Sequence, residues 1–135
     1  MSYPAMKEAG VDVRLGTDGS ASNNSLDLRA EAKAASLVQR HDHWDARILG
    51  PEQTWNLATK GSQDWITWDL SDIRMRPFGR DGRRLLSNLI YSGAKVLDVF
   101  VGGEAVRRDG RTLTLEEDMV AKELEESVTE YYQDV

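Results

Sequence analysis

Hydrophobic and polar residues alternate near the start of the chain and then change to a helical spacing. Residues 11–15, with the sequence VDVRL, alternate as a half-buried strand does. Glycine and short polar residues from 16 to 25 then interrupt regular structure. Residues 26–40 are rich in alanine, with their larger apolar residues near one face. They predict a helix capped by the side chain of Asn24 or Ser25.

A second, shorter helix is predicted after a loop at residues 41–49. Proline suits the first position of a helix, so Pro51 marks the start of this one. Gly61 can end it in the left-handed conformation. Residues 65–70, WITWDL, are aromatic and branched and predict a strand.

The remaining sequence predicts small elements and one long helix. A polar loop at 74–84 precedes an apolar segment at 85–91, which predicts one or two helical turns. Gly102-Gly103 lies between two strand-like runs and signals a hairpin. Thr114 and Glu117 form the pattern of a capping box. This capping box predicts a helix that starts after Thr114 and runs to about Tyr132. Its apolar stripe would consist of Val120, Leu124, Val128 and Tyr131.

The sharpest change of pattern, from helical to strand-like, occurs at residues 61–64. We therefore expect two domains, residues 1–63 and 64–135.

Composition narrows the classes of protein that this chain represents. The net charge is −6, so nucleic acid is a poor partner. The absence of cysteine excludes disulfides, thiolate metal sites and a cysteine nucleophile. No apolar run is long enough to span a membrane, and the first residues do not read as a signal peptide. A cytoplasmic protein that binds neither membranes nor nucleic acid is expected.

The segment from 11 to 28 carries the candidate chemistry. A strand, a turn and a helix in succession form one unit of an α/β fold. In barrels of this kind the reactive groups lie at the C-terminal ends of the strands. Asp18 occupies that place, and a carboxylate there can bind a cation or move a proton. An Asp-Gly pair is also a common turn signal, so the argument depends on the residues around it.

Residues 10–28, GVDVRLGTDGSASNNSLDL, resemble the last barrel strand of the metal-dependent amidohydrolase superfamily. The likeness is to methylthioadenosine/S-adenosylhomocysteine deaminases and triazine hydrolases. Later segments, including the hairpin at 96–106, resemble the same family, so the resemblance covers nearly the whole chain. It implies an α/β fold containing the last strand and helices of a (β/α)8 hydrolase barrel, plus part of the small C-terminal β-domain.

The resemblance also implies the function and the roles of individual residues. Asp18 would bind one divalent metal, zinc or iron, and would carry a proton from the metal-bound water to the leaving ammonia. Thr17, Ser20, Ser22 and Asn23 would shape the loop that holds it. The implied reaction is hydrolysis of a C–N bond, the deamination of an adenosine-type or related ring such as a triazine.

The family's other metal ligands lie upstream of this motif, and no counterpart of that region precedes it here. The 61–64 stretch is also shorter than in the family. We therefore expect the chain alone to be incomplete and inactive, with weak or absent metal binding. The alternative to an enzyme is a non-catalytic remnant, or a subunit that complements a chain bearing the rest of the barrel; a homo-oligomer is a further option.

His41 and His43 have the spacing of a metal-binding pair. The motif places them after the eighth barrel helix, so exposed loop histidines are the preferred interpretation.

Overall fold

The computed structural model describes residues 2–133 and divides into two compact units. Unit 1 contains the residues up to Ser62 together with Leu70–Ala94. Unit 2 contains Gln63–Asp69 and the residues from Lys95 onward. The expected boundary after residue 63 lies beside the first crossing between the units, whereas residues 70–94 group with unit 1 rather than with the C-terminal part.

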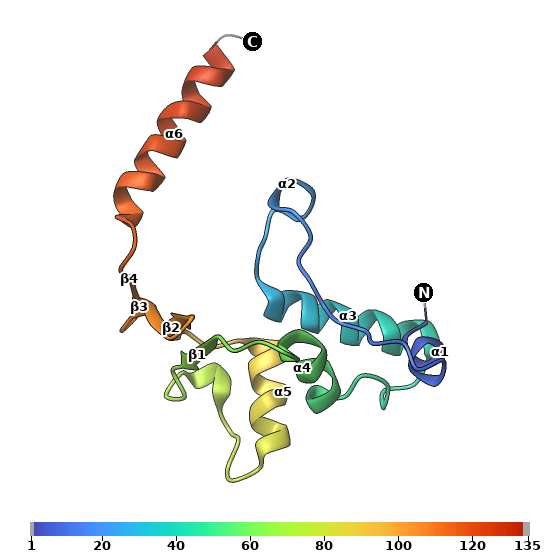
Figure 1. Ribbon diagram of the computed structural model, residues 1–135. Helices are drawn as coiled ribbons and strands as arrows, with labels where there is room; N and C mark the ends of the chain where they lie inside the picture. Colours follow the sequence, from blue (N-terminus) through green and yellow to red (C-terminus); the bar gives the residue numbers. More distant parts are fainter. Residues whose placement is uncertain (1, 134–135) are drawn as a thin grey trace. The chain divides into compact units, whose positions relative to one another are not determined.

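Helices form nearly all the regular structure of unit 1. Three of them, α3, α4 and α5, pack on one another, and α1 lies beside the C-terminal part of α3 (Figure 1). The helices are α1 (Tyr3–Glu8), α2 (Ser20–Asn23), α3 (Leu28–His43), α4 (Pro51–Thr59), the 3-10 turn η1 (Ile73–Met75) and α5 (Gly82–Ser92).

The helix predicted from residue 26 begins slightly later than expected. The carboxylate of Asp27 accepts hydrogen bonds from the backbone amides of Arg29, at 2.9 Å, and Ala30, at 3.2 Å. Asp27 therefore caps α3, and the predicted caps Asn24 and Ser25 were wrong. Asn24 instead ends α2 in the left-handed region, at φ 53°. The helix also continues through His43, so the loop predicted from residue 41 begins only at Trp44.

Helices α4 and α5 of unit 1 show what local signals can and cannot predict. Helix α4 begins at Pro51, as predicted, and Gly61 follows it at φ +82°. Helix α5 is longer than the one or two turns expected. It begins within the predicted polar loop, because the Asp81 carboxylate accepts from the amide of Arg83 at 3.0 Å and caps it.

The core of unit 1 combines apolar side chains with two polar ones. The residues under 9% exposed are Ala32, Ser36, Leu49, Thr54, Met75, Leu89 and Ile90. The Ser36 hydroxyl donates to the carbonyl of Leu49 at 2.9 Å and lies 2.6 Å from the hydroxyl of Tyr91. The Thr54 hydroxyl lies 2.8 Å from the same carbonyl. Both buried hydroxyls are therefore hydrogen-bonded, as buried polar groups must be.

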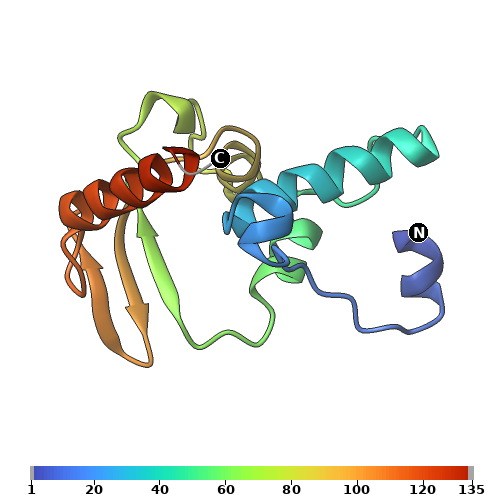
Figure 2. The ribbon, with the colours of Figure 1, turned by 90° about the horizontal axis from the view of Figure 1, so that it is seen from above.

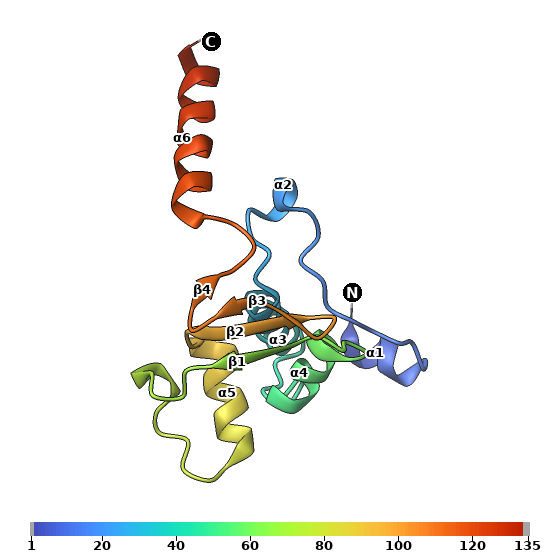
Figure 3. The ribbon, with the colours of Figure 1, turned by 60° about the vertical axis from the view of Figure 1, so that its left-hand side comes forward.

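Unit 2 is built on a four-stranded antiparallel sheet with its strands in chain order (Figure 3). Its strands are β1 (Trp65–Trp68), β2 (Val96–Val101), β3 (Glu104–Arg108) and β4 (Arg111–Thr112). The predicted hairpin at Gly102-Gly103 is confirmed, with φ of 58° and 87° at the two glycines. Both values are positive, which glycine adopts without penalty. Across β1 and β2, the rings of Trp65 and Phe100 stack with centroids 3.7 Å apart.

The last helix, α6 (Glu117–Gln133), is present as predicted, but its start differs (Figure 2). The expected capping box placed Glu117 inside the helix, with its side chain turned back to Thr114. The Glu117 carboxylate instead accepts from the Thr112 hydroxyl and from the Arg107 guanidinium, the latter at 2.9 Å. A charged partner on β3 outcompetes the local cap, so the capping box was wrong.

Residues 11–15 are not part of a sheet, so the predicted strand is absent. The segment makes one backbone hydrogen bond to α4, from the amide of Leu15 to the carbonyl of Leu57, at 3.0 Å. A strand is stabilised by a neighbouring strand on at least one side. The described part of the chain places no strand beside this segment.

Candidate active-site loop

Asp18 lies on an exposed loop between the extended segment 11–15 and α2. Its backbone is left-handed, at φ 58°, a conformation that aspartate tolerates better than most residues. One carboxylate oxygen, Oδ1, accepts from the backbone amide of Gly19 at 2.7 Å. That bond orients the carboxylate, and the second oxygen, Oδ2, has no hydrogen bond among residues 2–133.

Two of the neighbours expected to shape this loop, Thr17 and Ser22, donate hydrogen bonds to its backbone. The Thr17 hydroxyl donates to the carbonyl of Asp18 at 3.2 Å. The Ser22 hydroxyl donates to the carbonyl of Gly19 at 2.9 Å, closing the first turn of α2. Ser20 begins that helix and is exposed. Within the described chain, none of these hydroxyls contacts the Asp18 carboxylate.

Asn23 makes the longest-range contacts of the loop. Its side-chain nitrogen, Nδ2, donates to the carbonyl of Thr17 at 3.0 Å and to the carboxylate of Glu31 at 2.6 Å. Glu31 belongs to the first turn of α3. The sequence motif gives Glu31 no role, although an acidic residue in the first turn of a helix interacts favourably with the helix dipole.

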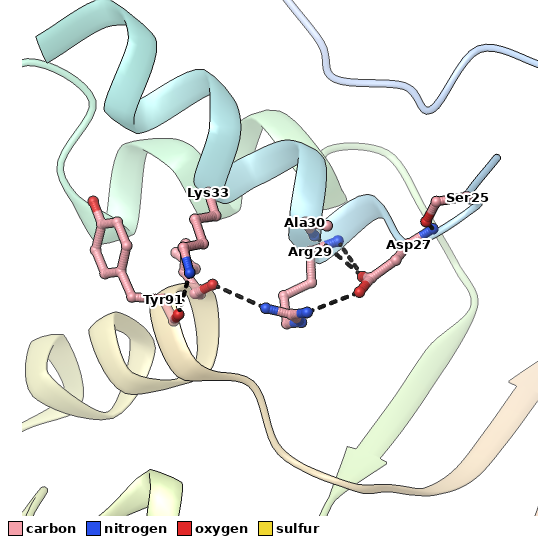
Figure 4. Close-up of polar contacts among 7 residues, drawn as sticks. Ser25, Asp27, Arg29, Ala30, Lys33 and Tyr91 are labelled. Carbon is pink, nitrogen blue, oxygen red and sulfur yellow. Dashed lines mark hydrogen bonds and ion pairs between the residues drawn. The ribbon is translucent and has the colours of Figure 1, made fainter. Parts of the chain in front are cut away.

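Helix α3, which receives the loop, is fixed to α5 by two cations (Figure 4). The Arg29 guanidinium donates to the carbonyl of Ile90 at 3.2 Å, and the Lys33 ammonium donates to the carbonyl of Tyr91 at 2.9 Å. These carbonyls are in the last turn of α5, where helical carbonyls lack partners and positive charge is favourable. Arg29 also pairs with the Asp27 carboxylate at 2.8 Å.

The extended segment before the loop is tied to the end of α4. Lys60 and Arg14 both bind the carboxylate of Asp12, and Arg14 also donates to the carbonyl of Lys60 at 3.3 Å. Hydrogen bonds from Lys60 and then Arg14 lower the pKa of Asp12 below its usual value. Asp12 is therefore a charged anchor at neutral pH and a poor proton carrier.

The two histidines do not join this loop. His41 is exposed near the end of α3, with its ring 5.6 Å from that of Trp44. The Nε2 atom of His43 lies 3.0 Å from the hydroxyl of Ser2. Both belong to α3 rather than to the predicted loop. Across residues 2–133, no group of three or more His, Cys, Asp or Glu side chains could hold a metal ion.

No helix in the described range combines the length and the apolar character needed to cross a bilayer.

Comparison with known proteins shows which enzymes the chain resembles. No protein-family model matches the chain. The 5-methylthioadenosine/S-adenosylhomocysteine deaminase of Bacillus thuringiensis (strain Al Hakam) is 36% identical, over 86% of this chain. The proteins of the same name from Bacillus cytotoxicus and Bacillus cereus (strain AH187) are 35% and 36% identical, again over 86% of the chain. The chain spans 30% of the length of each of these relatives.

A solved structure also resembles this chain, and it too is a deaminase. An adenosine deaminase from Xanthomonas campestris with bound zinc superimposes with a TM-score of 0.78 at 25% identity. The match covers 90% of this chain and 31% of that one. The chain thus has an α/β fold like part of an adenosine deaminase. Its resemblance to methylthioadenosine/S-adenosylhomocysteine deaminases, expected from residues 10–28, is confirmed.

Proposed function

We propose that the chain contributes a catalytic carboxylate, Asp18, to a hydrolytic deaminase acting on an adenosine-type or related aminated ring. The observation that supports the proposal is the position of the Asp18 carboxylate on its loop. Asp18 lies exposed on it, with one oxygen held by the amide of Gly19 and the other without a hydrogen bond to residues 2–133. The loop belongs to a chain that is 36% identical to deaminases of methylthioadenosine and S-adenosylhomocysteine.

In this proposal Asp18 carries the proton of the reaction. A water molecule adds to the ring carbon that bears the amine, and the Asp18 carboxylate accepts the proton that the water loses. The protonated carboxyl then donates that proton to the departing nitrogen, so ammonia leaves and the carboxylate is restored. The exposed position of Asp18 allows contact with both the water and the substrate.

A divalent metal, zinc or iron, would supply the Lewis acidity that activates water in such a site. The described residues do not form that site by themselves. Catalytic zinc sites typically use about three protein ligands, and no group of three candidate side chains occurs between residues 2 and 133. We propose that Asp18 is the one ligand that this chain contributes, and that a barrel region carried by a complementing chain contributes the others.

The same arrangement accounts for the lack of a strand beside residues 11–15 within the described range. We propose that this segment is the last strand of a (β/α)8 barrel in the assembled enzyme, and that residues 1–63 form the barrel part. Residues 64–135 would then belong mainly to the small β-domain, although 70–94 group with the residues up to Ser62 in unit 1.

A non-catalytic subunit or remnant is the second candidate. The observation that favours it is the absence of any metal-binding cluster among residues 2–133. The two candidates differ in one outcome, namely whether activity depends on Asp18 once a barrel region is supplied.

A chimeric enzyme tests this directly. The segment of the Bacillus cereus deaminase that matches this chain would be replaced by this chain, and ammonia release from methylthioadenosine and S-adenosylhomocysteine would be measured. We expect activity, with a loss of about 10²–10⁴-fold in kcat for Asp18→Asn, because a proton carrier typically contributes that much. Asp12→Asn is the matched control, since Asp12 lies in the same segment and is tied to Lys60.

A folded, zinc-loaded chimera without activity would favour the non-catalytic subunit. An active chimera unaffected by Asp18→Asn would remove Asp18 from the mechanism.

Zinc titration of the isolated chain gives a second test. With one candidate ligand on the loop, we expect affinity no tighter than about micromolar, because affinity follows the number of ligands. Isothermal titration calorimetry measures it, with Asp18→Asn as the comparison. Stoichiometric nanomolar binding would mean that His41 and His43 join Asp18, contrary to their positions on α3.

A further inference from the structure

A single amide side chain connects the Asp18 loop to the first turn of α3. We propose that Glu31, acting through Asn23, is a positioning residue that holds the backbone of the loop so that Asp18 presents its free carboxylate oxygen. The inference rests on the proposed function of Asp18, and it adds a residue that the sequence motif did not single out.

The geometry of Asn23 carries the first step. An asparagine amide has two N–H donors. Nδ2 donates to two acceptors, namely the Thr17 carbonyl at 3.0 Å and the Glu31 carboxylate at 2.6 Å. The Thr17 carbonyl belongs to the peptide group that precedes Asp18. Holding that oxygen restricts rotation of the peptide and therefore the direction of the Asp18 side chain.

Helix α2 is too short to hold the loop by itself. It has four residues, and Gly19 caps it without a side-chain hydrogen bond. Isolated turns of this length are not stable in water, because helix nucleation is costly. The Asn23 bridge therefore supplies the link from the loop to an element with a core of its own.

The other end of the bridge is firmly anchored. Glu31 is four residues after the cap Asp27, on a helix whose Ala32 and Ser36 are buried. Arg29 and Lys33 fasten the same turns to the carbonyls of α5 (Figure 4). Gly93, which follows α5, lies so close to Arg29 that an added Cβ would be 3.1 Å from its Cζ atom. The anchor is therefore packed as well as hydrogen-bonded.

The charge of Glu31 sets the strength of the bridge. A hydrogen bond to an ionised acceptor is shorter and roughly twice as strong as a neutral one. Glu31 contacts Asn23 rather than the Asp18 carboxylate, so its role is to position and not to react. An isosteric Asn23→Asp change would turn the donor into an acceptor facing two other acceptors.

The isolated chain provides a test that needs no activity. Backbone ¹⁵N relaxation would be measured for residues 17–24 in the parent chain, Glu31→Ala, Glu31→Gln and Asn23→Asp, each also carrying Val120→Gln and Leu124→Gln on α6 to limit self-association. We expect the order parameters of this loop to fall toward about 0.6 or below in Glu31→Ala and Asn23→Asp, the range of flexible backbone. Glu31→Gln keeps an acceptor oxygen and should fall less. Asp42→Asn, at the far end of α3, is the control and should leave the loop unchanged.

The double variant Asn23→Asp with Glu31→Gln tests whether the two side chains interact directly, because it exchanges donor and acceptor. The amide introduced at position 31 can donate to the carboxylate introduced at position 23, so the loop should recover part of its order. Loop order that is the same in Glu31→Ala and in the parent chain would overturn the bridge.

The chimera then tests whether the bridge serves Asp18. In an active chimera, Glu31→Ala should lower kcat about 10–100-fold with KM and zinc content unchanged, because misplacement of a reacting group by about 1 Å costs that much. Glu31→Gln should retain most of the activity. An unchanged kcat in Glu31→Ala would overturn the positioning role. An inactive parent chimera would instead count against the proposed function, and the relaxation experiment would still decide the bridge.

Discussion

At the scale of single residues, the polar side chains that hold unit 1 together could not be predicted from the spacing of hydrophobic and polar residues. Ser36 lies in an alanine-rich helix where a serine suggests exposure, yet it is fully buried. Its hydroxyl meets the Leu49 carbonyl and the Tyr91 hydroxyl, both from other segments. Asp18 could be singled out as a candidate because its motif is local, and its role stays a prediction. Ser36 and Glu31 could not be singled out, because their partners are set by packing.

Ser36→Ala should destabilise the chain by about 1–3 kcal/mol, because it leaves buried partners of the hydroxyl with fewer hydrogen bonds. Urea unfolding followed by circular dichroism measures the change. Ser127→Ala on the exposed helix α6 is the matched control, since that hydroxyl bonds only the carbonyl one turn earlier. An equal effect of the two substitutions would contradict the role assigned to Ser36.

At the scale of elements, those whose signals are local were predicted well. The hairpin at Gly102-Gly103 and the start of α4 at Pro51 follow from backbone chemistry within a few residues. Residues 11–15 carry the pattern of a strand but have no strand beside them in the part of the chain that the structure describes, so the pattern alone did not produce one. A helix cap likewise depends on which other partners its side chains can reach. Glu117 binds the Arg107 guanidinium instead of turning back to the start of the helix.

Asp98 makes the stability of the sheet depend on pH. Its carboxylate accepts from the amide of Asp109 at 3.0 Å and from the hydroxyl of Thr67 at 2.8 Å. These bonds, the amide of Asp109 first, lower the pKa of Asp98 below its ordinary value of 3.8. A lowered folded-state pKa contributes stability above the unfolded-state value, which is lost as the pH falls through the folded-state value.

We therefore expect the sheet to lose stability as the pH falls below 3.8, and Asp98→Asn to flatten that part of the profile. Thermal unfolding at a series of pH values, with the Asp109 amide followed by NMR, measures it. Glu104→Gln, on the neighbouring strand, is the control. A profile with the same slope in Asp98→Asn would show that the carboxylate does not couple to folding.

At the scale of the whole molecule, apolar surface remains exposed on both units. On α6 the stripe of Val120, Leu124 and Val128 is 46%, 64% and 44% exposed. On α3, Leu37 and Val38 are 47% and 60% exposed. Exposed apolar surface of this kind marks an interface or an aggregation risk.

The isolated chain should accordingly self-associate at micromolar concentration, by burial of these faces. Sedimentation velocity over a range of concentrations measures this. Val120→Gln with Leu124→Gln should shift the distribution toward the monomer, whereas Glu126→Gln, on the same helix, should not. A monodisperse, cooperatively melting parent chain would contradict the expectation.

The route of the chain between the two units has a consequence for how they fold. Strand β1 belongs to unit 2, but the chain returns to unit 1 for residues 70–94 before β2 pairs with β1. The pairing of β1 with β2 therefore closes a loop that contains η1 and α5. Closing a flexible loop costs entropy that rises with its length, and a loop already folded spares part of that cost. Formation of α5 on its partners should thus speed sheet pairing, and a cut in the chain near residue 79 should slow refolding of the sheet more than it weakens the finished structure.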